Sequence, residues 1–270
     1  MKLWLKISAW VLLLSGVGVI FYFANILDEN KVIDPPNVAI HYEGENAMLT
    51  EKELLYRLSQ KQFLFNGQRV KELDIPGIER IINEMPEVKN AHVFRDIGSS
   101  WSIELELRKP IARIFNTFGQ SFYIDSDGIL MNRSDLHTAR TLVFSGSIKD
   151  EFQVGKISEI INNDSLKSIK KLDDIYRISN YVCNDPLLHH LIAQVYVNEQ
   201  GEFIMVPIVG EALIHFGKAD TERKVADKFE RLKVFYQQGL PYEGWNKYAE
   251  INLSYDGQIV CRKRQGQPAN

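Results

Sequence analysis

An uninterrupted apolar run opens the chain. Lys2 and Lys6 precede a segment from Ile7 to Leu27 that carries no charged side chain. At helical rise, about 21 residues match the ~30 Å hydrocarbon core of a bilayer. The pattern therefore predicts a transmembrane helix at residues 7–27. The lysines predict that residues 1–6 form a cytoplasmic tail.

A cleaved signal peptide is the alternative interpretation of this segment. The apolar run is longer than a typical signal-peptide core, and Tyr22-Phe23-Ala24 lacks the pattern of small residues that a signal peptidase requires. We therefore expect an uncleaved anchor, with the remainder of the chain on the extracytoplasmic side.

The next pattern predicts a small mixed domain at residues 38–109. Pro35 and Pro36 predict a stiff linker at residues 28–37, because each proline fixes its own φ. The order strand, helix, helix, strand, strand follows, with a capping box at Thr50. Such an order packs two helices on one face of a three-stranded sheet and leaves its strand edges open.

The pattern of residues 110–264 predicts a domain made mostly of strands. The expected strands are Ile111 to Phe115, Ser121 to Ile124, Ile129 to Met131, Leu142 to Ser145 and Ala212 to Phe216. Two helices are expected as well, one from about Leu166 to Val182 and one that carries Val225, Phe229, Leu232 and Tyr236. The charged residues of the second helix favour a solvated face. The predicted fold class is α+β, with a mixed, mainly antiparallel sheet and covering helices.

The last patterned segment runs from Tyr248 to Arg262. Ile251, Leu253, Tyr255, Ile259 and Cys261 share one parity, which a single long strand would place on one face. Asp256-Gly257 is equally consistent with a hairpin turn. Residues 265–270 are expected to form a C-terminal tail.

Composition narrows the function classes. The chain has 270 residues and a formal net charge of −3, so no basic excess indicates nucleic-acid binding. Cys183 and Cys261 are its two cysteines, and both a disulfide and two free thiols are compatible with their positions.

The sequence gives little support for a catalytic or metal-binding function. The chain has no G-x-S-x-G and no H-E-x-x-H motif, and the S-x-x-K spacing at Ser168–Lys171 lacks its companion motifs. Asp125–Gly128 begins like a calcium loop, but Leu136 stands where the bidentate glutamate is required, so a hairpin turn is expected. We predict no catalytic residue, no metal, no cofactor and no small-molecule substrate.

The order of these segments resembles the FtsQ/DivIB cell-division family, whose members carry a polypeptide-transport-associated (POTRA) domain after the membrane anchor. The residues that carry the resemblance are Val88–Arg95, Trp101–Leu107, Lys109–Ala112, Phe122–Gly128, Leu213–Gly217, Lys224 and Arg231-Leu232. The chain departs from the family's leucine-arginine-tyrosine strand near the C-terminus, since Ser254 stands in place of the arginine.

The resemblance implies a non-enzymatic scaffold of the divisome, anchored in the inner membrane at the division septum. Its partners would be other divisome membrane proteins, including a small coiled-coil bitopic division protein that adds a strand to the distal domain. The candidate contact residues are Ser254, Tyr255, Gly257, Ile259, Lys224 and Arg231. Two alternatives are a POTRA-containing outer-membrane assembly or secretion module and a membrane-anchored cell-wall enzyme.

Overall fold

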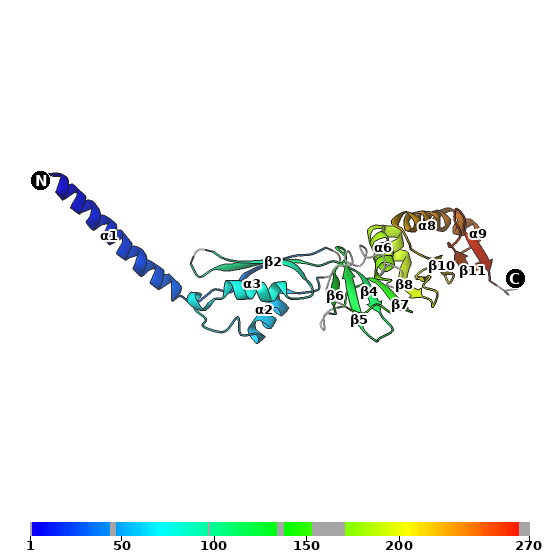
Figure 1. The fold of residues 1–270 in the computed structure, drawn as a ribbon, viewed down its shortest axis with the longest axis horizontal. Helices are drawn as coiled ribbons and strands as arrows, with labels where there is room; N and C mark the ends of the chain where they lie inside the picture. Colours follow the sequence, from blue (N-terminus) through cyan, green and yellow to red (C-terminus); the bar gives the residue numbers. More distant parts are fainter. Residues whose placement is uncertain (1, 44–46, 97, 134–137, 153–170, 265–270) are drawn as a thin grey trace. The chain divides into compact units, whose positions relative to one another are not determined.

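The computed structural model describes residues 2–43, 47–96, 98–133, 138–152 and 171–264 (Figure 1). The chain forms two compact units, residues 1–107 and residues 108–270. The expected C-terminal tail, the first residues of the helix expected from Leu166 and the start of the S-x-x-K spacing lie outside the described residues.

The N-terminal apolar run forms one helix, α1, over Lys2–Glu29. Trp4, Trp10 and Leu12 on this helix are exposed. In the described part of the chain, no helix combines the length and the apolar character that crossing a membrane requires. The apolar run thus forms the helix that its pattern predicted, and a membrane span at residues 7–27 stays a prediction.

The remainder of the first unit has the predicted order of strands and helices. Its elements are β1 (Asn37–His41), α2 (Glu51–Gln60), the short 3-10 helix η1 (Val70–Glu72), α3 (Ile75–Asn83), β2 (Val88–Arg95) and β3 (Trp101–Leu107). The sheet order is β1-β3-β2, in which β3 is parallel to β1 and antiparallel to β2. The core combines Leu54 and Leu58 of α2 and Ile78 and Ile82 of α3 with alternate residues of the sheet such as Ile103.

Side chains at the helix starts explain where α2 and α3 begin. The Thr50 hydroxyl accepts a hydrogen bond from the Glu53 amide at 3.4 Å, as expected for the N-cap of α2. The Asp74 carboxylate does the same for the Gly77 amide at 3.0 Å in α3. These contacts satisfy amides that have no partner inside their own helix.

The predicted linker at residues 28–37 is held against the first unit. The Ile33 amide donates to the Gln68 carbonyl at 3.0 Å, and the Asp34 amide donates to the Ser99 carbonyl at 3.1 Å. The indole Nε1 of Trp101, a buried residue, donates to the Asp34 carbonyl at 2.9 Å. Interactions with the folded unit therefore position this segment, in addition to the stiffness that its prolines provide.

The second unit is built on a nine-stranded mixed sheet. Its strands are β4 (Pro110–Phe115), β5 (Ser121–Asp125), β6 (Leu130–Asn132), β7 (Leu142–Gly146), β8 (Ile192–Val197), β9 (Phe203–Pro207), β10 (Leu213–Gly217), β11 (Tyr248–Asn252) and β12 (Val260–Lys263). They lie in the order β12-β11-β10-β9-β8-β7-β4-β5-β6. The pairs β4–β7, β7–β8 and β10–β11 are parallel, and the others are antiparallel. This arrangement confirms the predicted mixed α+β class.

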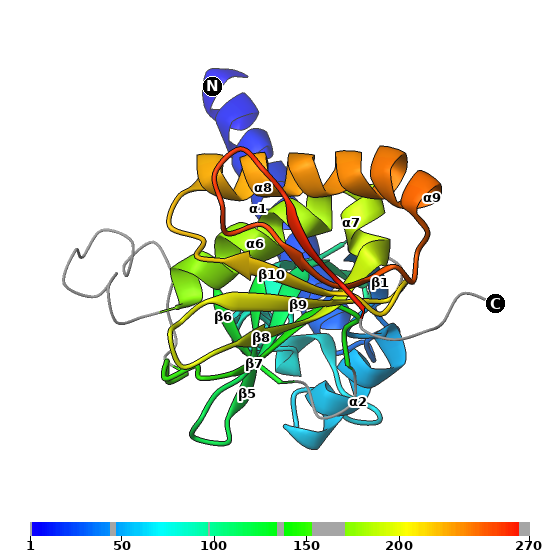
Figure 2. The ribbon, with the colours of Figure 1, turned by 90° about the vertical axis from the view of Figure 1, so that its right-hand side faces the viewer.

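Helices cover one face of this sheet (Figure 2). They are α6 (Leu172–Asn184), α7 (Pro186–Leu191), α8 (Glu222–Val234), the π-helical turn η2 (Phe235–Gly239) and α9 (Leu240–Glu243). Alternate strand residues such as Phe144, Val195 and Phe216 meet Ile178 of α6 and Phe229 of α8 in one core. The helices thus provide the cover that the sequence predicted.

The turn predicted at Asp125–Gly128 is confirmed. Asp125–Gly128 forms the turn between β5 and β6, and the Asp125 carboxylate accepts from the Asp127 and Ile129 amides. The segment at residues 199–202 joins the antiparallel strands β8 and β9. The Asp125 carboxylate also pairs with Arg108 at 2.9 Å, an arrangement that suits a structural turn.

The final segment forms a hairpin, which decides between the two interpretations left open for Tyr248 to Arg262 in favour of the turn. β11 ends at Asn252, and Val260 pairs back with it in antiparallel register. Leu253 is buried in the core, whereas Tyr255 is 51% exposed. The turn therefore separates residues that a single strand would have placed on one face. Cys183 and Cys261, both described residues, form no disulfide.

Candidate partner-binding site

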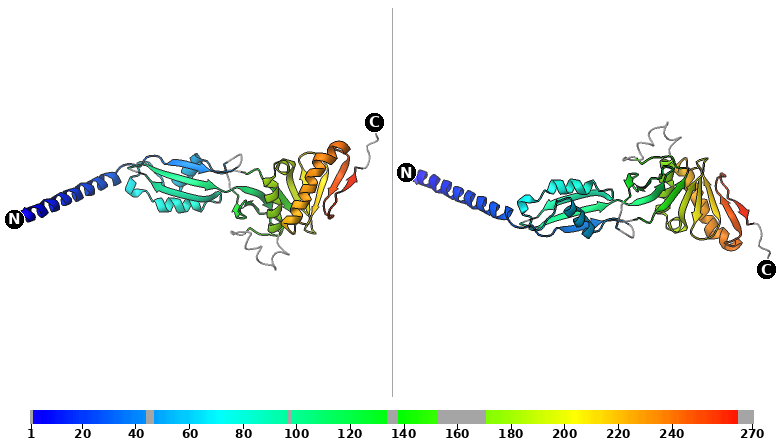
Figure 3. Two further views of the ribbon diagram at one scale, coloured as in Figure 1. Left: turned by 90° about the horizontal axis from the view of Figure 1, so that it is seen from above. Right: turned by 90° about the horizontal axis from the view of Figure 1, so that it is seen from below.

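The site begins at the last strand of the nine-stranded sheet. Among the described strands, β12 pairs only with β11 and forms one edge of the sheet (Figure 3). An edge strand presents backbone N–H and C=O groups that a further strand can pair with. Val260 is 44% exposed and Arg262 is exposed, so the side chains of β12 do not cover this edge.

Arg231 of α8 holds the turn that leads into β12. Its Nη1 donates to the Tyr255 carbonyl at 2.8 Å and to the Gln258 carbonyl at 2.6 Å. The two carbonyls lie on either side of Gly257, which has a φ of +72°. The guanidinium therefore closes the turn from outside, because a planar cation can serve two acceptors at once.

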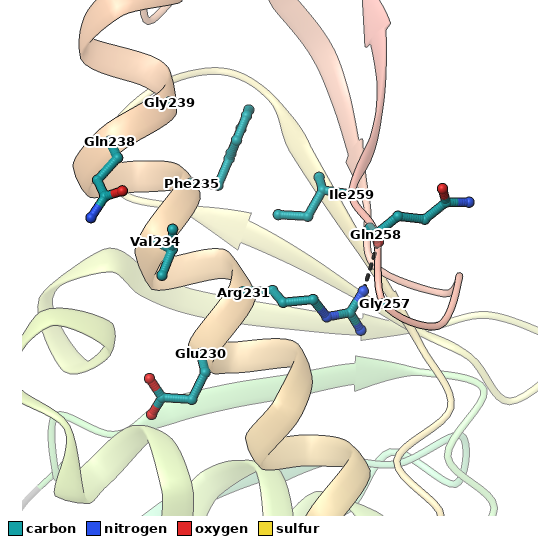
Figure 4. A pocket seen from close by; sticks show the side chains of 9 residues that line it. All are labelled: Glu230, Arg231, Val234, Phe235, Gln238, Gly239, Gly257, Gln258 and Ile259. Carbon is teal, nitrogen blue, oxygen red and sulfur yellow. Dashed lines mark hydrogen bonds between the residues drawn. The ribbon is translucent and has the colours of Figure 1, made fainter.

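An apolar groove lies between α8 and this turn (Figure 4). It has a volume of about 530 Å³. Its walls are Glu230, Arg231, Val234, Phe235, Gln238, Gly239, Gly257, Gln258 and Ile259. Phe235 and Ile259 face each other across it, and both pack partly against the core. The groove thus offers an apolar surface immediately beside the turn into the edge strand.

The other side of the same turn rests on the end of β10. The Leu253 amide donates to the His215 carbonyl at 2.8 Å. Gly217, with φ +73°, lies so close to Ser254 that a Cβ on the glycine would be 2.6 Å from the serine Oγ. The left-handed conformation favours glycine here, and any side chain at this position would require Ser254 to shift.

Lys228 fixes the backbone around Gly217. Its Nζ donates to the Phe216 carbonyl at 2.8 Å and to the Lys218 carbonyl at 2.7 Å, and it lies 4.8 Å from the centre of the Phe216 ring. The residue is 6% exposed, and burial lowers the pKa of its ammonium group.

A second groove, of about 680 Å³, runs along the N-terminal half of α8. It is lined by Thr221, Arg223, Lys224, Asp227, Lys228, Glu230, Arg231, Asp256 and Gly257. Cations and carboxylates alternate along it, and Lys224 pairs with Asp220 at 3.3 Å. In contrast to the apolar groove, it is a charged surface.

An ion-pair network secures α8 to the neighbouring helices. Lys233 Nζ lies 2.8 Å from carboxylate oxygens of both Asp185 and Glu230, and these hydrogen bonds raise its pKa. The Tyr181 hydroxyl donates to Glu230 at 2.6 Å, while its ring stacks on Phe229 at 5.0 Å. Burial, together with the bond to Glu230, raises the pKa of Tyr181 to about 12. The helix that forms one wall of the groove is thus anchored on its far side.

The edge strand itself is basic. Arg262 pairs with Glu250 of β11, with 2.9 Å between Nε and Oε2, and this contact lowers the pKa of the carboxyl group. Arg264 pairs with Glu211. Cys261 precedes both arginines, and burial raises the pKa of its thiol. Both arginines thus have partners on their own chain beside the open edge.

The structure brings together part of the predicted set. Arg231, Gly257 and Ile259 line the apolar groove, and Lys224 lies on the charged one. Ser254 and Tyr255 lie in the turn and line neither groove, which differs from their predicted place on an exposed strand. The open edge is formed by residues 260–263, because the strand that follows the hairpin turn is the outermost strand of the sheet.

Sequence reasoning missed Lys228, and it placed the partner-binding residues in the turn rather than on the edge strand β12. The charges of α8 were interpreted as a solvated face, but Lys228 lies three residues after Val225 and four before Leu232, which places it on the buried stripe. That spacing was the available signal. Across the described residues, no group of three or more histidine, cysteine, aspartate or glutamate side chains could hold a metal ion.

Comparison with known proteins places this site in a family context. A family model described as FtsQ/DivIB, C-terminal related, matches residues 109–262. The chain belongs to this family. The FtsQ/DivIB-related match covers the sheet from β4 into β12, including both grooves, and links the chain to cell division with an envelope location. No curated protein matches the chain.

Proposed function

We propose that the protein is a non-enzymatic scaffold of the divisome whose distal unit captures an extended segment of another division protein. The observation that carries this proposal is the open edge of β12 beside the apolar groove. A strand added there would gain backbone hydrogen bonds from the edge, while the groove would select side chains.

The groove supplies the specificity of this capture. Phe235 and Ile259 offer apolar contacts next to the turn, so an incoming segment with an apolar side chain near its end would find cover there. The partner would be a divisome membrane protein, such as a small coiled-coil bitopic protein. The family is generally non-catalytic, which supports a scaffold over an enzyme.

The first unit has a separate role in the proposal. We assign residues 38–109 to a POTRA-like domain, on the basis of the β-α-α-β-β order and its three-stranded sheet. Residues 110–264 would form the capturing domain. The chain would act at the inner membrane near the septum, where the exposed apolar side chains of α1 provide a surface for lipid.

Site-specific photo-crosslinking in the native envelope tests the capture. A photoreactive residue replaces Arg262 on the β12 edge or, as the matched control, Asn132 on β6 at the opposite edge of the same sheet. The proposal expects one small membrane protein crosslinked from position 262 and none from position 132. Crosslinks from 262 to an outer-membrane barrel protein would favour the assembly-module alternative.

The envelope location has its own test. Cells that express the full chain or the chain without residues 2–27 are fractionated after alkaline extraction. The proposal expects the full chain in the membrane fraction and the shortened chain in the extract. Recovery of both proteins in the same fraction would contradict the proposed role of α1 in attaching the chain to the membrane.

A further inference from the structure

Lys228 is a buried cation without a carboxylate in contact. No carboxylate of the described chain lies within ion-pair distance of its Nζ, which donates hydrogen bonds to the carbonyls of Phe216 and Lys218. Burying an ammonium group is costly unless hydrogen bonds compensate it. An apolar residue at this position would fill the space, but it could not bind either carbonyl.

The two carbonyls frame the point where β10 meets the turn before β12. They lie on either side of Gly217, where an added Cβ would lie 2.6 Å from the Ser254 Oγ. Their direction is set by the left-handed conformation of Gly217, and the ammonium group holds both of them. Lys228 thus fixes the surface on which the start of the turn rests.

Arg231 performs the same task one helical turn further along α8. It holds the carbonyls of Tyr255 and Gln258 on either side of Gly257. Residues three apart lie on neighbouring positions of a helix surface. Two cations of one helix therefore bind two glycine-containing turns, and the second turn leads directly into the edge strand.

We propose that Lys228 is a positioning residue for strand capture. Together with Arg231 it sets the position of residues 253–259 and thereby of β12, without touching the captured segment. This inference rests on the proposed function for its biological role. The structural part of the inference is that the position of the β12 edge depends on Lys228, a buried side chain of α8.

Hydrogen exchange of the full chain, measured by mass spectrometry without any partner, tests the structural content. In Lys228→Met, exchange of the amides at residues 253–263 should be about tenfold faster than in the wild type, while β8 and β9 stay unchanged. Lys228→Arg should retain most of the protection. Lys224→Met, which removes an exposed cation of the same helix, is the control and should change nothing in that segment.

Two outcomes would overturn the proposal. One is a folded Lys228→Met variant with wild-type exchange at residues 253–263, and the other is acceleration spread evenly over the whole sheet. Should Lys228→Met fail to fold, Lys228→Gln decides instead, because its amide keeps donors for one carbonyl and should give an intermediate, local acceleration.

Crosslinking from position 262 then connects this result to function. Lys228→Met should lower the crosslink yield severalfold, and Lys228→Arg should restore it. An unchanged yield with a loosened turn would contradict the positioning role. Absence of any crosslink in the wild type would defeat the proposed function alone, since the exchange result needs no partner.

Discussion

Gly217 leaves no room for a Cβ beside Ser254, at the point where the end of β10 supports the turn before the edge strand. A Cβ on Gly217 would lie 2.6 Å from the Ser254 Oγ, and the glycine has a φ of +73°. Gly257, in the same turn, has nearly the same φ of +72° but nothing within 4 Å of its Cβ position. Substitutions at the two glycines therefore distinguish the free-energy cost of the left-handed backbone conformation from the cost of a steric clash.

We expect Gly217→Ala to destabilise the second unit more than Gly257→Ala. The left-handed conformation alone costs an alanine about 1–2 kcal/mol, and this term applies to both variants. Gly217→Ala adds the clash with Ser254, for a total of about 2–4 kcal/mol. Urea unfolding of the full chain measures both. Equal losses would show that the contact with Ser254 contributes nothing.

Arg231→Met should loosen the turn without unfolding the unit. The substitution keeps an apolar stem but removes the donors to the Tyr255 and Gln258 carbonyls, at a cost of about 1–2 kcal/mol in the free energy of unfolding. Lys224→Met, which breaks an exposed ion pair with Asp220, should cost less than about 1 kcal/mol. Urea unfolding again provides the measurement, and a larger loss for Lys224→Met would contradict the assignment.

Tyr236 should make the second unit lose stability at alkaline pH. Burial raises the pKa of Tyr236 to about 12, so the folded state keeps a proton that the unfolded chain releases near its ordinary pKa of about 10. The stabilisation is complete below about pH 10 and is lost as the pH rises towards about 12. The full difference corresponds to about 3 kcal/mol.

Tyr236→Phe should remove this part of the alkaline loss. The measurement is the free energy of unfolding at several pH values between 8 and about 11, within the range where the chain stays intact. Tyr242→Phe serves as control, because it removes a hydroxyl from a side chain that is 89% exposed. An identical alkaline decline in wild type and Tyr236→Phe would exclude this role for Tyr236.

Trp101→Phe should release the segment that follows α1. The indole N–H donates to the Asp34 carbonyl, and the smaller ring also leaves space in the core, for a combined cost of about 2–3 kcal/mol. Faster hydrogen exchange at the Ile33 and Asp34 amides is the specific signal. Tyr56→Phe, at an exposed position, is the control. Unchanged exchange at these two amides would mean that the indole does not hold the segment.

Apolar patterning along the sequence predicted most of the strands, although β5 buries residues of both its faces. Ala112 and Ile114 of β4 enter the core, as their parity requires. The ends of β5, β6, β7 and β10 lie within a residue or two of the predicted ends. The order of strands across the sheet did not follow from this pattern. It depends on pairings such as β4 with β7, which join segments far apart in the chain.

The site was harder to predict because it depends on a turn. Parity alone placed Ile251 and Tyr255 on one strand face. In the structure Ile251 is buried in β11, whereas Tyr255 is exposed in the turn between β11 and β12. A charged residue such as Lys228 was assigned to the surface by residue type, although its spacing placed it in the core. Its compensation comes from backbone carbonyls, which leave no trace in the sequence.

Protection of the β12 amides by a captured segment tests the central claim most directly. The full chain is purified alone and with the partner identified by crosslinking from position 262, and hydrogen exchange is compared for β12 and for β6 at the opposite edge. We predict that exchange at residues 260–263 slows by about tenfold or more in the complex, while β6 is unaffected. Unchanged exchange at β12, with protection of the helix-free sheet face around Tyr196 and Val206 instead, would contradict strand capture.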